Sequence, residues 1–312
     1  VRGWIADAQA VVARKKAPRL ATGAQCSAPY ECGFLAHCQS AEPQAEHHVR
    51  WLPRRSQALK AHIEEHGISE LRDVPDDLLN PTQQRVKAAT LSGQAFFDQP
   101  ATAQALAAHK LPGYFIDFET IQFGVPLWKG TRPYQQLPFQ FSVHRLGRTG
   151  RATHQAFLDL SGGNPSLAFA QSLVAACGER GPVFVYNAAF ETTRIRELAE
   201  RHPRLATALR AINDRVVDLL PIARQHYYHP SQQGSWSIKA VLPALCPELH
   251  YDALDGVQDG GAAQQAYLEA ITPATSAPRK AELERQLLAY CSLDTWAMVR
   301  LWSAFTGQPV RD

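Results

Sequence analysis

The chain has 312 residues, of which 45% are hydrophobic and 20% are charged. This composition is typical of a packed globular protein and excludes a disordered chain, and the length predicts about two domains. The formal net charge of +3 neither requires nor excludes a nucleic-acid partner, because a basic groove can lie within a nearly neutral total. The sequence holds no apolar run of about 18 residues, so we expect no membrane-spanning helix and no membrane partner.

The first residues, VRGWIADAQAVVARKK, lack the apolar core of a signal peptide. They also lack an initiating Met, so we expect a fragment or a domain from a longer chain. Six cysteines without a secretion signal favour a reducing cytoplasm, where thiols bind metals or pack in the core. We therefore expect a cytoplasmic protein.

The chain divides into three predicted regions. Residues 1–50 form a cysteine-containing segment that is rich in turn formers. Residues 51–110 are predicted to be a helical linker, because the stretches 55–67 and 80–97 carry apolar residues at helical spacing. From 111 to 312 apolar strands alternate with amphipathic helices, which indicates an α/β domain.

Within the third region the sequence predicts five strands, at 114–120, 138–147, 151–160, 181–187 and 214–220. The helices are predicted at 166–180, 189–202, 237–245, 261–271 and about 278–305. Three strands in a meander, followed by strand–helix–strand, predict a mixed five-stranded sheet that is flanked by helices.

Two carboxylates, Asp117 and Glu119, lie one residue apart in the apolar strand YFIDFET. Residues i and i+2 of a strand face the same side, here near the C-terminal end where open α/β sheets place ligands. Like charges this close are costly in a low dielectric unless a cation lies between them, and Mg²⁺ prefers carboxylate oxygens. The alternative is that one acid caps a turn and the other faces solvent.

Two later segments carry further acids. Glu191 lies in the first turn of the helix that follows the strand VFVYN, and alone it is better explained as an acid that stabilises a helix N-terminus. Tyr290 and Asp294 are spaced i and i+4 in the final helix, so they share one face. Alone, that pair is equally well explained as a buried tyrosine bonded to a solvated aspartate.

In this order the three motifs resemble those of the DEDD superfamily of 3′→5′ exonucleases, which has a ribonuclease H-like fold. The first motif is Asp-x-Glu, here IDFET, and the second is Asn-x-x-Phe-acid, here NAAFE. The third, Tyr-x-x-x-Asp of the tyrosine subtype, is here YCSLD. The resemblance spans about residues 110–310. More narrowly, SIKAVLPAL and VQDGGAAQQAYLEAI are similar to a bacterial family in which such a domain follows a RecB-like nuclease region.

The resemblance implies an enzyme that hydrolyses DNA or RNA from the 3′ end with two Mg²⁺ or Mn²⁺ ions. Asp117 would bridge both ions, Glu119 and Asp294 would hold the ion that activates water, and Glu191 would support the second ion through water. Tyr290 would orient that water, because a phenol with an unperturbed pKa near 10 is a poor base. Glu191 departs from the motif, in which the acid is usually Asp.

Thr120 and Asn187 are the candidate substrate-binding residues. Thr120 could contact the terminal nucleotide or pack, and for its neighbour Phe118 packing is favoured. Asn187 could contact substrate, although bracing the active-site loop is the preferred role. Two other functions stay open: a module that binds nucleic acid or a partner without cutting, and a sugar hydrolase. The latter ranks well below, because it needs two acids roughly 5–10 Å apart across a cleft.

Cys26, Cys32 and Cys38 lie in the segment CSAPYECGFLAHC, and thiolates suit iron–sulfur clusters or zinc. The segment resembles the cysteine cluster of RecB-like nuclease domains that bind a 4Fe-4S cluster, whose fourth ligand lies far upstream and would be missing here. The three cysteines could instead pack as small apolar groups, or a histidine could complete a zinc site, from among His37, His47 and His48. The other three cysteines are predicted to lie in the core: Cys177, Cys246 and Cys291.

Overall fold

The structure is a computed structural model that describes residues 2–18, 20, 22–26, 30–40, 45–249 and 251–311. Its central sheet has five strands in the order β4-β3-β2-β5-β6. Every predicted strand is present, so the predicted mixed sheet flanked by helices is confirmed. The strands are β2 (Gly113–Ile121), β3 (Leu137–Leu146), β4 (Ala152–Leu158), β5 (Val183–Val185) and β6 (Val216–Asp218).

The first three strands of this sheet form an antiparallel meander, in which Asp117 of β2 pairs with Ser142 of β3. β5 and β6 run parallel to β2, beginning with the pair Tyr114 and Val183. Parallel neighbours need crossover connections, which helices provide here. These helices are α6 (Ser166–Cys177), α7 (Ala189–Arg201) and α8 (Ala206–Asn213).

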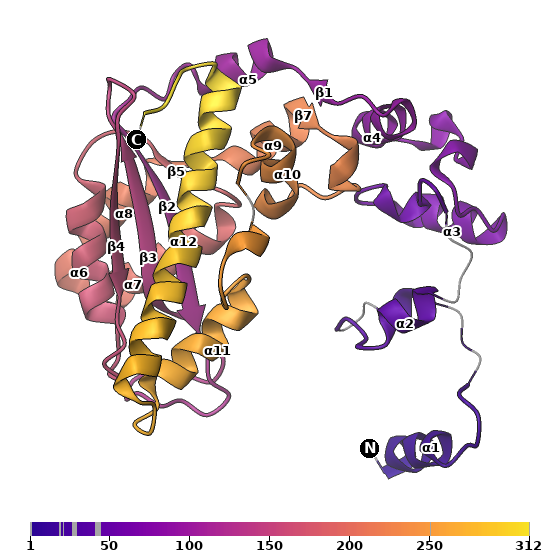
Figure 1. Ribbon diagram of the computed structural model, residues 1–312, viewed down its shortest axis with the longest axis horizontal. Helices are drawn as coiled ribbons and strands as arrows, with labels where there is room; N and C mark the ends of the chain where they lie inside the picture. The colour runs from indigo at the N-terminus through magenta and orange to yellow at the C-terminus, as the bar shows by residue number, and fades with distance from the viewer. Residues whose placement is uncertain are drawn as a thin grey trace.

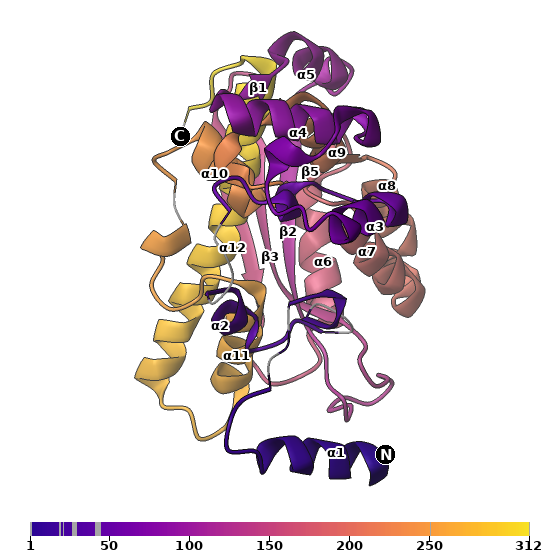
Figure 2. The same cartoon turned by 90° about the vertical axis from the view of Figure 1, so that its right-hand side faces the viewer.

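The two faces of the sheet are covered by different helices, as Figures 1 and 2 show. Ile116 and Phe118 of β2 pack against the side of α6, α7 and α8. Phe115 and Ile121 pack on the opposite face, against the long helix α12 (Ala277–Thr306) and its neighbours. Because side chains alternate along a strand, the odd-numbered Asp117 and Glu119 also face α12.

Three further helices complete the layer of α12: α9 (Leu219–His226), α10 (Ile238–Leu245) and α11 (Gly260–Ile271). The sequence prediction of a strand to residue 220 was wrong at its end. The side chain of Asp218 accepts a 2.9 Å hydrogen bond from the N–H of Leu220 and so begins α9. An aspartate in this position caps a helix, and a strand cannot continue past it.

The predicted helical region at 51–110 contains α3 (Gln57–Glu65), α4 (Pro81–Ser92) and α5 (Gln99–Leu106). The predicted helix at 80–97 was wrong at its end, because α4 stops at Gly93, whose φ of 70° is left-handed. Its last two residues form β1 (Phe96–Phe97), which pairs with β7 (Tyr227–Tyr228) in a separate two-stranded sheet. α5 packs on α12, where the hydroxyl of Thr102 donates to the carbonyl of Phe305 at 2.8 Å.

The N-terminal helices α1 (Arg2–Val12) and α2 (Leu35–Ser40) have no buried residues. In Figure 1 they lie apart from the sheet. Residues 49–79 instead enclose a small apolar core of their own, with Leu59 and Leu71 at its centre. Among the described residues, no helix combines the length and the apolar character needed to cross a membrane.

Candidate metal centre and active site

Asp117, Glu119 and Asp294 meet between β2 and α12. One carboxylate oxygen of each residue lies within 4.8 Å of the other two. Glu119 and Asp294 are buried, with 8% and 7% of their surface exposed, while Asp117 is half-buried. The structure therefore brings together three of the four acids that the sequence motifs identified.

Glu191, the fourth acid, lies outside this group of three, in the first turn of α7. Only 3% of its surface is exposed, and its Oε2 has no hydrogen-bond partner among the described residues. Burial and the charges of Asp294 and Glu119 raise the pKa of Asp117, and the charge of Glu191 raises it further. The fourth acid therefore lies near the other three. A buried oxygen without a partner is costly, and a water or a cation would satisfy it.

The loop that precedes Glu191 is fixed by Asp218 at the end of β6. The two carboxylate oxygens of Asp218 accept hydrogen bonds from the N–H groups of Asn187 at 2.9 Å and Ala188 at 3.0 Å. Asn187 has a left-handed φ of 76°, a conformation that Asn adopts more readily than most residues. Its backbone is therefore braced while its side chain is exposed. Sequence reasoning missed Asp218, although an acid where a parallel strand ends is a recognisable signal.

The neighbours of the two β2 acids are buried. Phe118 is 3% exposed and meets the ring of Phe169 edge-on, with centroids 5.1 Å apart, as its predicted packing role requires. Thr120 is 4% exposed and follows an irregularity in strand register after Glu119. The substrate-binding roles of Thr120 and Asn187 stay predictions.

Burial raises the pKa of all four acids. It raises the pKa of Glu119 to about 8 and that of Glu191 to about 8. The pKa of Asp294 rises to about 6, and that of Asp117 rises well above its ordinary range through burial and the charges of its neighbours. The cluster therefore retains protons near neutral pH unless a cation takes their place.

Two tyrosines and a lysine surround Asp294. Tyr251, in the turn η7 (Tyr251–Ala253), donates a 2.6 Å hydrogen bond from its hydroxyl to Asp294 Oδ1. The amine of Lys239 lies 5.0 Å from the ring centroid of Tyr251 and 4.9 Å from that of Tyr290. Burial and the charges of Asp294 and Glu119 raise the pKa of Tyr290, so its hydroxyl keeps its proton.

The positive charge of Lys239 acts against burial and lowers the pKa of both Glu119 and Asp294. Sequence reasoning placed neither Lys239 nor Tyr251 in the site. Lys239 is the one charged residue of the apolar helix α10, which is a usable signal in retrospect. Nothing in the local sequence distinguishes Tyr251.

Cys291 is buried in α12, as predicted for a core cysteine, but it also touches the acids. Its thiol lies 3.6 Å from the carbonyl oxygen and 3.8 Å from Oδ2 of Asp117. Burial raises the pKa of this thiol, and the negative charges of the nearby carboxylates raise it further. Cys177 and Cys246 are buried in the core, as predicted.

The three N-terminal cysteines are half-buried free thiols. Within the described part of the chain, the group of Asp117 is the one set of three His, Cys, Asp or Glu residues whose ligand atoms come within 4.8 Å of one another. The structure thus leaves Cys26, Cys32 and Cys38 without a gathered ligand set, although the N–H of Cys32 donates to the carbonyl of Cys26 at 2.8 Å. The iron–sulfur or zinc site stays a prediction.

A hard divalent cation fits the carboxylate cluster. Carboxylate oxygens are the ligands that Mg²⁺ and Mn²⁺ favour, and the three gathered groups supply them from two rigid elements. The Oε2 of Glu191 adds a buried acceptor that no described residue satisfies.

Comparison with known proteins gives one family match. Residues 114–237 match a family described as a domain of unknown function (DUF2779), which is less than half of the 312 residues. The matched segment runs from β2 to the residue before α10, so it contains Asp117, Glu119 and Glu191 and excludes Asp294. No curated protein and no solved structure matches the chain.

Proposed function

We propose that the chain is a metal-dependent 3′→5′ exonuclease that hydrolyses phosphodiester bonds of DNA or RNA, on a ribonuclease H-like domain. The observation that carries the proposal is the meeting of Asp117, Glu119 and Asp294 within 4.8 Å in a mostly buried site. The three-strand meander followed by parallel β5 and β6 supports the fold assignment. The order of the three sequence motifs supports the reaction class.

The carboxylates Asp117, Glu119 and Asp294 would hold two Mg²⁺ or Mn²⁺ ions, and Glu191 would support one of them. Such ions stabilise the attacking and leaving oxygens of a phosphodiester in line with each other. The protein contributes rigid placement, since β2 fixes two of the acids and α12 fixes the third. Phosphate is an anion, so a site of four acids needs the cations to admit it.

The remaining side chains of the site have roles that follow from their charge and their hydrogen bonds. Tyr290 keeps its proton, so it would orient the attacking water by hydrogen bonding and would not act as a base. Lys239 places a positive charge beside Glu119 and Asp294, where it would contact a non-bridging phosphate oxygen. Tyr251 would hold Asp294 in place through its 2.6 Å hydrogen bond.

The test is an exonuclease assay on 5′-labelled single-stranded DNA and RNA with Mg²⁺ or Mn²⁺. We expect shortening from the 3′ end, which Asp117→Asn with Asp294→Asn should slow by at least about 100-fold. Asp77→Asn, which changes an exposed acid remote from the site, is the matched control and should leave the rate unchanged. Shortening that persists in the double variant would overturn the proposal.

A second candidate is a module that binds nucleic acid without cutting it. The observation that favours it is the position of Glu191 outside the group of three, at the one motif position where the residue departs from the usual Asp. Binding of Mn²⁺ and of nucleic acid, without shortening of any substrate, would select this candidate.

A further inference from the structure

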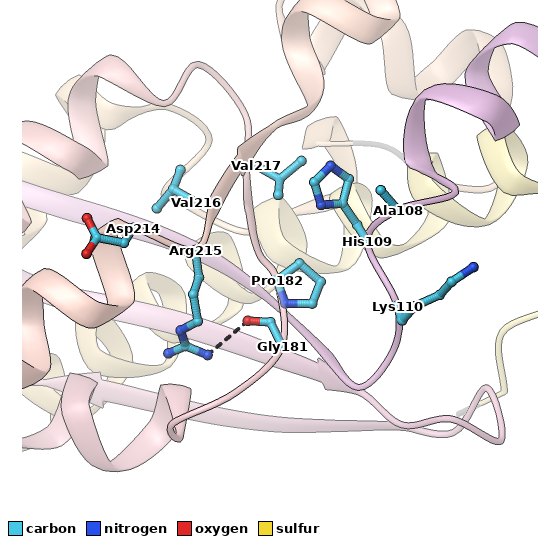
Figure 3. Close-up of a pocket in the computed structure, with 9 residues that line it drawn as sticks. All are labelled: Ala108, His109, Lys110, Gly181, Pro182, Asp214, Arg215, Val216 and Val217. Atoms are coloured by element: carbon cyan, nitrogen blue, oxygen red, sulfur yellow. Dashed lines mark hydrogen bonds between the residues drawn. The ribbon is translucent and has the colours of Figure 1, made fainter.

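Two cavities lie on either side of the loop between α5 and β2. The first, of about 390 Å³, is lined by this loop and by the segments that lead into β5 and β6 (Figure 3). The second, of about 360 Å³, is lined by α5, the β3–β4 turn and the end of α12. Both cavities are lined by His109 and Lys110, so they adjoin at these two residues.

The cavities are distant from the carboxylates. They lie where β2 begins, at Gly113, which pairs with Leu146 at the end of β3. Asp117 and Glu119 follow four and six residues later in the same strand. At a rise of about 3.3 Å per residue, this places the acids roughly 13 to 20 Å along the sheet from its cavity edge. The cavity edge is therefore a separate surface.

Positive side chains line the second cavity. Lys110 and Arg148 both border it, and the described residues that line it include no acid. Arg148 donates from Nε to the carbonyl of Leu111 at 3.3 Å, which holds its guanidinium at the cavity. In the described part of the chain, neither cation has a carboxylate within the 4.0 Å of an ion pair.

The positive charge continues along the β3–β4 hairpin. Arg145 and Arg151 flank Arg148 in this hairpin and are exposed, and strand alternation places their side chains on the face opposite Leu146 and Ala152, which pack with α12. Arg311 lies beside Arg151 through a backbone bridge and is also exposed. The cations at this edge thus extend from the second cavity to the opposite face of the sheet.

The first cavity has apolar walls. In Figure 3 the side chains of Pro182 and Val217 face the ring of His109, while the carboxylate of Asp214 lies at the end far from Lys110. The guanidinium of Arg215 turns aside to the carbonyl of Gly181, at 2.9 Å. An imidazole ring and apolar side chains beside Lys110, which has no carboxylate partner among the described residues, suit a ligand with planar rings on an anionic backbone.

We propose that this edge of the sheet binds single-stranded nucleic acid, with phosphates on Lys110 and Arg148 and with bases against the cavity walls. A lipid surface fits less well, because none of the large exposed apolar side chains lies among the cavity residues. The binding requires neither the carboxylates nor a metal ion. It can therefore be tested, and refuted, independently of the proposed hydrolysis.

The experiment measures fluorescence anisotropy of a labelled single-stranded oligonucleotide with the full chain in a chelator. The background is Asp117→Asn, so that no cutting disturbs the titration. We expect Lys110→Ala with Arg148→Ala to weaken binding about tenfold or more at low salt. Since each phosphate contact on a single strand contributes a slope of about 0.7 to log K against log salt, the double variant should lower that slope by about 1.4.

Lys60→Ala removes one exposed charge from α3, remote from this edge, and is the matched control that should change neither quantity. Lys110→Gln, a milder change of an exposed side chain, should lower the slope by about 0.7 and guards against misfolding of the double variant. Unchanged affinity in both variants would overturn the proposal, as would a wild-type chain that binds no oligonucleotide. Binding to anionic vesicles in preference to the oligonucleotide would also overturn it.

Discussion

The hydroxyl of Tyr251 donates a 2.6 Å hydrogen bond to Oδ1 of Asp294, and both side chains are 7% exposed. Tyr251 comes from the turn between α10 and α11, whereas Asp294 comes from the middle of α12. The bond therefore ties that turn to the carboxylate cluster. With Oδ1 engaged by Tyr251, the other oxygen of Asp294 is the better placed to bind a cation.

This bond predicts a difference between two Tyr→Phe changes. We expect Tyr251→Phe to lower the free energy of unfolding by about 1.5–3 kcal/mol, the range for hydrogen bonds to charged groups. Tyr267 is the matched control, because it is fully buried and its hydroxyl has no partner among the described residues. Tyr267→Phe should be neutral or stabilising. Urea unfolding at neutral pH in a chelator measures both, and equal losses would contradict the assignment.

The raised pKa values predict that the metal-free protein loses stability as pH rises. A carboxyl of ordinary pKa near 4.3 in the unfolded chain has a pKa of about 8 at Glu119 and at Glu191 when folded. Between these values the folded state binds more protons than the unfolded state, so stability falls with rising pH. Burial lowers the pKa of His144 to about 3, which has the opposite sign but acts only below about pH 6.5.

The measurement is the free energy of unfolding from about pH 7.5 to about pH 8.5, where His144 is almost entirely neutral in both the folded and the unfolded state. Millimolar Mn²⁺ should reverse the decline, since a cation replaces the protons of the cluster. Asp117→Asn with Glu119→Gln should reduce the pH dependence to the part that Glu191 contributes and should remove the response to Mn²⁺. A pH profile that is the same in the wild type and this variant would argue against a proton-holding cluster.

Lys239 provides a separate test of the electrostatics. Its charge lowers the pKa of Glu119 and Asp294, so Lys239→Met should raise both values further and steepen the loss of stability with pH. The change also removes a 2.6 Å hydrogen bond to the carbonyl of Gln258, a loss that does not vary with pH. The slope of the free energy of unfolding against pH therefore measures the effect of the Lys239 charge separately from the loss of the hydrogen bond. Lys239→Arg should keep the wild-type slope, and a slope unaltered by Lys239→Met would count against the role.

Local pattern was enough to predict one side of the site. The alternation of a strand places Asp117 and Glu119 on one face without knowledge of anything distant. Their meeting with Asp294 was expected from the resemblance, because spacing alone cannot say which face of a sheet a helix crosses. Tyr251 was missed because its contact spans 43 residues to Asp294 and leaves no local periodicity.

Contacts between residues far apart in the sequence also explain an error in the predicted secondary structure. Phe96 and Phe97 continue the apolar pattern of α4, yet they pair as β1 with Tyr227 and Tyr228 far along the chain. A pairing partner so far along the chain produces no pattern in a short stretch of sequence. The end of β6 was missed for a different reason, because Asp218 has two roles there, capping α9 and bracing Asn187.

Glu191 is the residue whose contribution decides between an active and an inactive site. If its carboxylate supports a cation, Glu191→Gln should reduce the exonuclease rate by about 100-fold or more, because the amide loses the negative charge while keeping the shape. Glu191→Asp shortens the side chain by one methylene and restores the usual acid of the motif. We expect it to retain the rate within about tenfold, since a water could span the change.

Single-turnover assays on a labelled oligonucleotide measure both variants, with thermal unfolding as a check on folding. The amide cannot ionise, so Glu191→Gln removes the cost of holding a buried carboxyl whose pKa is raised to about 8, and this variant of the metal-free protein should unfold at a higher temperature above about pH 6.5. A variant that is more stable and yet slow separates function from folding. Full activity in Glu191→Gln would remove Glu191 from the reaction and leave three acids to carry it.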